Sequence, residues 1–185
     1  MIGRRRFLGT VAVLPASILA EPQTADPSGV AGKVAAGEAR FGQTLKLPDG
    51  SPLFIKVATQ DTRGAFFLTE QPSGRKGGPP KHFHLEEDEW FYCLAGEYIV
   101  EIGNQRYELK AGDSVLGPRK VPHAFAFVGD TPGRLMVGFT PAGRMEKFFR
   151  DLDARGSYFG SGTAEDKEAA RQRYGIVNVG PPLVF

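Results

Sequence analysis

Cysteine, histidine and net charge are all scarce in this chain of 185 residues, which contains one cysteine and three histidines and has a formal net charge of +2. A single cysteine cannot form an intramolecular disulfide, and it excludes a structural zinc site built from four thiolates. We interpret Cys93 as a small buried hydrophobic residue rather than as a nucleophile.

The small positive charge comes from the first 20 residues, MIGRRRFLGTVAVLPASILA, which carry three arginines and no acid. The rest of the chain has 20 basic and 21 acidic side chains, a net charge of −1. No excess of basic residues remains to attract nucleic acid or an anionic membrane, so we predict neither as a partner.

Residues 1–20 have a basic start and an apolar run from Phe7 to Ala20, too short to span a bilayer comfortably. This pattern is typical of a secretory signal peptide, with cleavage predicted after Ala20. The stretch RRRFL resembles the twin-arginine motif, with Gly3 where serine or threonine is usual. The resemblance implies export of an already folded precursor by the twin-arginine machinery, a periplasmic or secreted location, and no stable membrane insertion of the mature form.

The rest of the chain is predicted to be a linker or N-terminal arm over residues 21–39, followed by one domain over residues 40–185. Short alternating or apolar runs, separated by many of the 24 glycines and 14 prolines, predict about ten strands, beginning with FGQTLKL at residues 41–47. Gly103-Asn104 is expected to form a two-residue hairpin turn. The fold class is therefore all-β, a sandwich or a barrel.

The C-terminal segment changes period and predicts one or two helices outside the β domain. Pro141 suits a first helical turn, and Thr163 to Tyr174 predicts a second helix, with Asp166 in its capping box and Gly175 as its stop. The first helix has an apolar stripe at i, i+3, i+4 and i+7, formed by Met145, Phe148, Phe149 and Leu152.

Two histidines lie one residue apart in the stretch KHFHLEEDEWF, residues 81–91. On a strand, His82 and His84 would point to the same face, so both imidazoles could converge on one point. The third histidine, His123, lies in another predicted strand. The pair and the third histidine together predict a metal site between two strands.

These residues resemble the two sequence motifs of the cupin family. The first motif, G(x)5HxH(x)3-4E(x)6G, is matched by His82, His84, Glu89 and Gly96, with Gly77 one residue closer than the pattern asks. The second motif, G(x)5PxG(x)2H(x)3N, is matched by Gly112, Pro118 and His123. Lys120 stands where this motif has glycine, and Phe127 where it has asparagine.

The resemblance extends over about residues 41–185, and the flanking segments look like small single-domain cupins akin to quercetin 2,3-dioxygenase. It implies a double-stranded β-helix, a jelly-roll barrel, with one divalent transition metal held inside by His82, His84, Glu89 and His123. Three imidazoles and one carboxylate suit iron, manganese, nickel, copper or zinc, and they leave coordination positions for water, oxygen or substrate.

Four consecutive acids follow His84, and only one has the spacing of a ligand. Asp88 fits the shorter permitted spacing, but Glu89 alone also has six residues before Gly96. We therefore choose Glu89 as the ligand and as the candidate catalytic base, and we expect Glu86, Glu87 and Asp88 to form a solvated turn.

Alternation along the strands predicts what surrounds the metal. Phe91 and Cys93 share the face of Glu89, and Phe125 and Phe127 share the face of His123. These four are the predicted pocket lining, which suits a flat organic substrate, although simple core packing would explain them as well. The opposite face of the Glu89 strand is also apolar and must be covered by the C-terminal helices, the N-terminal arm or a second subunit.

Three functions are open from the sequence. The leading hypothesis is a quercetinase-like, metal-dependent dioxygenase acting on an aromatic or enol-type small molecule. The alternatives are a non-catalytic protein that binds metal or a small molecule, and a metal-dependent lyase or decarboxylase of a small acid. The last would need polar or cationic groups inside the barrel.

The apolar outer face of the Glu89 strand, which carries Trp90, Tyr92 and Leu94, predicts a homodimer. A sizing column with light scattering checks this, with an expected mass of twice the monomer. A monomeric mass at every working concentration would contradict it.

Overall fold

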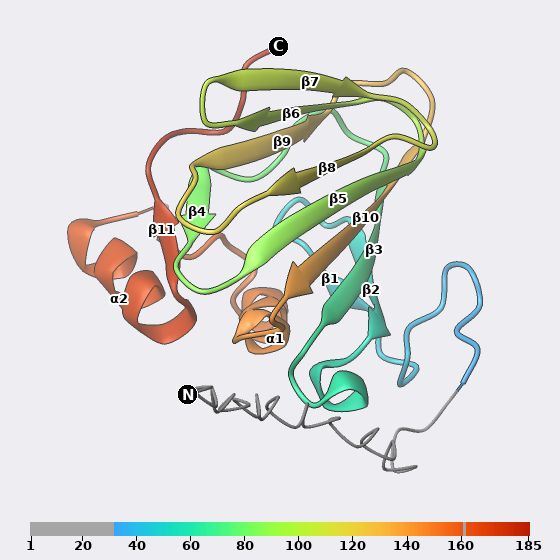
Figure 1. The fold of residues 1–185 in the computed structure, drawn as a ribbon, viewed down its shortest axis with the longest axis horizontal. Helices are drawn as coiled ribbons and strands as arrows, with labels where there is room; N and C mark the ends of the chain where they lie inside the picture. Colours follow the sequence, from blue (N-terminus) through green and yellow to red (C-terminus); the bar gives the residue numbers. More distant parts are fainter. Residues whose placement is uncertain (1–31, 161) are drawn as a thin grey trace, which may run out of the picture.

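The structure, a computed structural model, describes residues 32–160 and 162–185. The predicted signal peptide and residues 21–31 of the predicted arm lie outside this range, so these boundaries stay predictions. The described residues form two antiparallel sheets around one hydrophobic core, with two helices after the last strand of the first sheet (Figure 1). No helix in the described ranges is long and apolar enough to cross a membrane.

The first sheet has six strands and carries one of the four candidate ligands. In spatial order its strands are β1 (Leu45–Lys46), β2 (Pro52–Val57), β3 (Phe67–Ser73), β10 (Gly133–Thr140), β5 (Asp88–Ala95) and β8 (Ser114–Gly117).

The second sheet has five strands and carries the three histidines. In spatial order its strands are β11 (Ile176–Asn178), β4 (His82–His84), β9 (His123–Phe127), β6 (Tyr98–Ile102) and β7 (Gln105–Leu109). The predicted hairpin is confirmed, because Ile102 pairs with Gln105 across the Gly103-Asn104 turn. A 3-10 turn, η1 (Thr59–Thr62), follows β2 in the first sheet.

Side chains along β5 alternate between the core and the outer face of the sheet. Glu89, Phe91 and Cys93 are buried, whereas Trp90 and Tyr92 are only partly covered. The predicted strand at residues 41–47 is shorter than expected, with only Leu45 and Lys46 paired to β2. The reason is that Phe41 is exposed and Gly42 adopts a positive φ, so the alternating pattern there finds no partner strand.

A strand that the sequence analysis did not predict, β11, lies against the histidine-bearing strand. Ile176 pairs with His84 and Asn178 with His82, so β4 is held between β11 and β9. Beyond the end of β4, Leu85 N–H donates to Gly175 O. The C-terminal segment therefore supports the two adjacent histidines directly.

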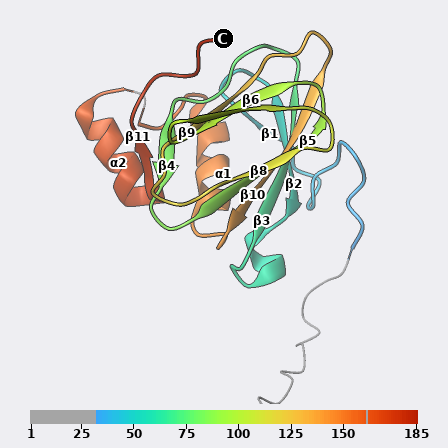
Figure 2. The same ribbon diagram turned by 45° about the horizontal axis from the view of Figure 1, so that its top comes forward.

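Helix α1 (Met145–Arg155) buries its predicted apolar stripe against the end of the barrel. Phe149 lies 6.1 Å from Phe67 and 5.9 Å from Phe139 between ring centroids. Figures 1 and 2 show α1 next to β10, with α2 (Ala164–Tyr174) farther out beside β11. Both helices pack outside the sheets as expected, and the phenylalanines of α1 join the core.

The predicted termini of α2 are confirmed, whereas the start of α1 is not. The Thr163 side chain caps α2 by accepting from Asp166 N–H, and Gly175 ends it in the left-handed conformation. Helix α1 begins at Met145, after a cis peptide bond at Thr140-Pro141, so Pro141 does not occupy its first turn.

The apolar outer face of β5 is partly covered by the chain that precedes β1. Val34 and Ala36 line a shallow surface pocket together with Trp90 and Tyr92. Lys56 Nζ holds this segment by donating to the carbonyls of Ala35, at 2.6 Å, and Glu38, at 3.0 Å. Leu94 and Leu116 remain about half exposed.

Lys120 adopts the backbone conformation that glycine would favour. Its φ is 64°, in the left-handed region, and its N–H donates to His84 O at 2.7 Å. The turn before His123 thus has the backbone conformation for which the second cupin motif has glycine. Because the residue here is lysine, this conformation costs backbone strain.

Replacing Lys120 by glycine should therefore stabilise the protein. The left-handed conformation costs roughly 1–2 kcal/mol in a non-glycine residue, and the extra freedom of an unfolded glycine offsets part of the gain, leaving about 0.5–1 kcal/mol. The measurement is the urea midpoint of Lys120→Gly against the original protein and against Lys120→Ala, which keeps the strain. Equal midpoints for the two variants would contradict the prediction.

Candidate metal centre

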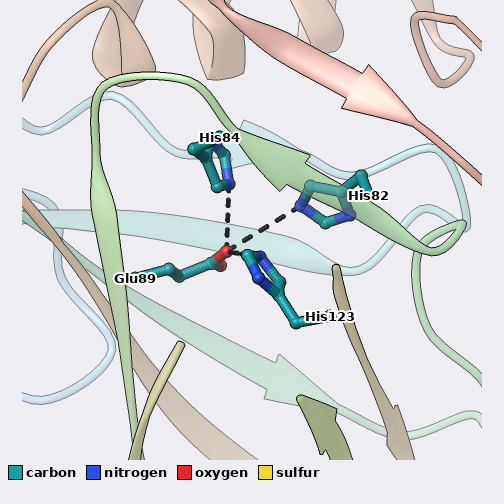
Figure 3. Close-up of side chains that lie close together, drawn as sticks. All are labelled: His82, His84, Glu89 and His123. Carbon is teal, nitrogen blue, oxygen red and sulfur yellow. Dashed lines mark hydrogen bonds and ion pairs between the residues drawn. The ribbon is translucent and has the colours of Figure 1, made fainter. Parts of the chain in front are cut away.

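The three histidines and Glu89 come from three strands and meet inside the barrel. His82 and His84 lie two residues apart on β4, so their side chains share one face. In the strand pairing, His82 lies opposite His123 of β9. Glu89, on β5, reaches them from the facing sheet (Figure 3). The structure thus brings together all four residues that the sequence predicts as ligands.

One carboxylate oxygen lies at the centre of the cluster. Glu89 Oε2 is 2.8 Å from His123 Nε2, 3.0 Å from His84 Nε2 and 3.8 Å from His82 Nε2. The four ligand atoms lie within 4.8 Å of one another. Metal–ligand bonds of about 2.0–2.2 Å place neighbouring donor atoms roughly 3 Å apart, so this spacing suits one ion.

Burial and charge prepare these groups to bind a cation. Burial lowers the pKa of His82 to about 3, and the neighbouring His123 and His84 lower it further, so the imidazole of His82 is neutral at pH 7. Burial alone would raise the pKa of Glu89, but hydrogen bonds from His123 and His84 outweigh it and lower that pKa. A neutral imidazole and an ionised carboxylate are the forms that bind metal.

Two of the three imidazoles are oriented by backbone carbonyls. His82 Nδ1 lies 2.8 Å from Pro80 O, and His123 Nδ1 lies 2.9 Å from Val121 O. A carbonyl can only accept, so each Nδ1 carries a proton, and each Nε2 is the nitrogen turned toward the cluster, the one that would bind a metal. Both Nε2 atoms point toward Glu89 in Figure 3.

The expectation that Glu86, Glu87 and Asp88 form a solvated turn is wrong for two of them. Asp88 begins β5 and forms an ion pair with Arg119 at 2.7 Å, which lowers the pKa of Asp88 to about 2. Glu87 has no exposed surface, and burial raises the pKa of its carboxyl. Glu87 lies just before β5, outside the alternation of that strand, so no spacing in the sequence marks it as buried.

A cavity of about 60 Å³ adjoins the cluster and extends to α1, whose side chains form part of its wall. Its lining is mostly apolar and aromatic, and none of its lining residues in the described ranges is a lysine or arginine. The side chains around it are Leu47, Gln71, Pro79, Pro80, His82, His84, Glu89, Phe125, Phe139, Met145, Phe148, Phe149, Leu152, Tyr158, Phe159, Ile176 and Asn178.

Of the four predicted pocket residues, only Phe125 lines this cavity. Phe91 and Cys93 are fully buried in the core, and Phe127 packs on Tyr98 at 5.3 Å between ring centroids. Parity gave the correct face of each strand, but side chains fill the barrel beyond the histidines, and the open space lies on the α1 side. The period of the α1 stripe predicts an apolar face but not that this face lines a cavity.

The donor set fits a transition metal, and its four ligands stay a prediction that substitution can test. His123→Ala and Glu89→Gln should each abolish stoichiometric metal, because each removes a donor atom from a buried cluster. Elemental analysis of the purified variants measures this. Asp88→Asn, a change in the neighbouring acid, is the matched control and should keep the metal. Full metal content in His123→Ala would refute the ligand set.

Comparison with known proteins agrees with this geometry. The family model described as "Cupin domain" matches residues 67–139, which contain all four candidate ligands. Quercetin 2,3-dioxygenase of Bacillus subtilis (strain 168) is 31% identical over 112 residues, covering 60% of this chain and 33% of that protein. Protein SchB of Streptomyces halstedii is 31% identical over 61 residues, covering 33% of this chain and 44% of that protein. The matched regions thus span less than half of these relatives.

Solved structures share the fold. KdgF from Halomonas sp. superposes with a TM-score of 0.51 at 17% identity, covering 60% of this chain and 94% of that one. The polyketide cyclase RemF from Streptomyces resistomycificus gives a TM-score of 0.50 at 21% identity, covering 60% and 80%. Such identities show a common fold and carry no activity across. The predicted double-stranded β-helix is confirmed: residues 67–139 match the cupin domain, and the chain resembles small cupins of the quercetin 2,3-dioxygenase type.

Proposed function

We propose that this cupin is a metal-dependent dioxygenase that acts on a small aromatic or enol-type substrate. The observation that carries the proposal is the convergence of three imidazoles and one carboxylate at the end of a cavity lined by aromatic rings. A divalent transition metal held there would supply Lewis acidity toward an enol or phenol oxygen and open positions for oxygen.

Glu89 is the residue of this chain suited to move a proton. Contacts with His84 and His123 lower the pKa of its carboxyl, and a cation bound by these imidazoles would favour the ionised form likewise. An ionised carboxylate that faces the cavity can accept the hydroxyl proton of a bound enol or phenol. Glu89 would therefore combine the parts of ligand and general base.

The cavity walls favour a flat, weakly polar substrate. Phe125 and Phe139 offer ring faces near the histidines, with Phe139 at 5.5 Å from His84 between ring centroids. Gln71 and Asn178 supply polar groups to orient substrate oxygens. Apart from the metal, a small dianionic acid would find no cation among the described lining residues, which disfavours the lyase or decarboxylase alternative.

The volume of the cavity indicates which substrate sizes it would admit most easily. A dry apolar cavity of about 150 Å³ holds one benzene, so the present 60 Å³ admits a ring only if side chains such as Phe148 and Phe159 move aside. Small enols and single-ring catechols require less movement than flavonols. We therefore expect them to be the better substrates.

Oxygen-electrode traces test this activity. The protein loaded separately with iron, copper, nickel and manganese is offered enols, catechols and flavonols, and at least one loaded form should consume oxygen, fastest with the smaller substrates. The His123→Ala variant, treated in parallel, should consume none. Absence of oxygen uptake across the whole panel would refute a dioxygenase acting on these substrate classes and leave the non-catalytic binding protein and the lyase as candidates.

A further inference from the structure

The outer nitrogen of His84 differs from those of the other two histidines. His82 and His123 each donate Nδ1–H to a backbone carbonyl two residues earlier. Among the described residues, His84 Nδ1 has no hydrogen-bond partner although it is completely buried. It faces Glu87 Oε2 at 3.8 Å.

Glu87 Oε2 is likewise buried and has no hydrogen-bond partner among the described residues. A buried carboxylate oxygen without a donor is costly, and native proteins keep such groups where a function requires them. The two unpartnered atoms, a ring nitrogen and a carboxylate oxygen, are complementary. They lie less than 1 Å beyond ordinary hydrogen-bond distance, which reaches about 3.2 Å.

The surrounding chain holds Glu87 in this place. Its other oxygen, Oε1, accepts from Arg144 N–H at 3.3 Å. Gly143 has a φ of 49°, and a Cβ at that position would overlap the Glu87 carboxylate. The loop that leads into α1 thus leaves a space shaped for this side chain and directs Oε2 toward His84.

We propose that Glu87 is a positioning residue of the metal centre, which accepts a hydrogen bond from His84 Nδ1–H when a metal is bound at Nε2. This inference rests on the metal site of the proposed function. A carboxylate partner fixes the tautomer of the imidazole and makes it a stronger donor than a neutral carbonyl does. His84 would then be the most strongly donating of the three imidazoles, and Glu87 would add a second negative charge beside the cation.

The first test compares Glu87→Gln with Glu86→Gln. Glutamine has the shape of glutamate and can keep the bond from Arg144 N–H, but its amide NH2 would then face Nδ1–H, donor against donor. Glu86 is the adjacent acid, with 63% of its side chain exposed, and serves as the matched control. The affinity for Zn²⁺ is measured by competition with a chelator, and Cu²⁺-loaded samples are compared by electron paramagnetic resonance.

Glu87→Gln should weaken Zn²⁺ binding roughly 10- to 100-fold and change the copper hyperfine splitting. Glu86→Gln should alter neither. If the original protein binds Zn²⁺ and Glu87→Gln binds it equally with an unchanged spectrum, the positioning role is overturned while the metal site stands. If the original protein binds no metal, the site and this inference fall together.

A measurement on the original protein tests the same proposal without any substitution, and so remains possible if Glu87→Gln fails to fold. In the Zn²⁺-loaded protein with nitrogen-15-labelled histidine, nuclear magnetic resonance should show His84 protonated at Nδ1. This proton should be the most deshielded of the three ring protons, because its acceptor is a carboxylate. An unprotonated Nδ1, or a proton that exchanges freely with solvent, would overturn the proposal.

Discussion

The pairing of β4 with β9 is the constraint on which the metal centre depends. It places His82 opposite His123, and alternation then turns His84 to the same side. Because β4 has only three residues, its register is set from both flanks, by β9 on one side and β11 on the other. A shift of one residue would turn both imidazoles of β4 away from Glu89. A strand from the far end of the chain therefore secures ligands that lie near its middle.

The two ends of the barrel differ: one is filled by packed side chains, and the other contains the cavity next to the histidines. Beyond the histidines, Phe91, Cys93, Tyr98 and Phe127 fill the interior completely. On the other side the space is closed by α1, whose stripe forms both core and cavity wall. The filled end can stabilise the fold by apolar burial without restricting the cavity.

The sequence was sufficient for the features that depend on spacing and period. The separations around Glu89 selected it from four neighbouring acids, and the stripe of α1 and the cap at Thr163 gave the helices. It was insufficient where tertiary packing decides. Parity assigns a face but not whether that face meets a cavity, so Phe91 and Cys93 were misplaced. The segment of β11 is too short to show a period, and Glu87 is buried only because Gly143, distant in sequence, makes room for it.

Arg144 links two parts of the molecule that otherwise serve different purposes. Its backbone N–H donates to the Glu87 carboxylate, and its guanidinium donates to Gln172 O near the end of α2. It is also the N-cap residue that precedes α1. The helix that shapes the cavity and the carboxylate beside His84 thus have one anchor. If the barrel holds a metal and Glu87 orients His84 as proposed, substrate preference and metal affinity would not be independent traits. A change in this loop that suits a new substrate would then alter how firmly the ion is held, so the two would have to evolve together.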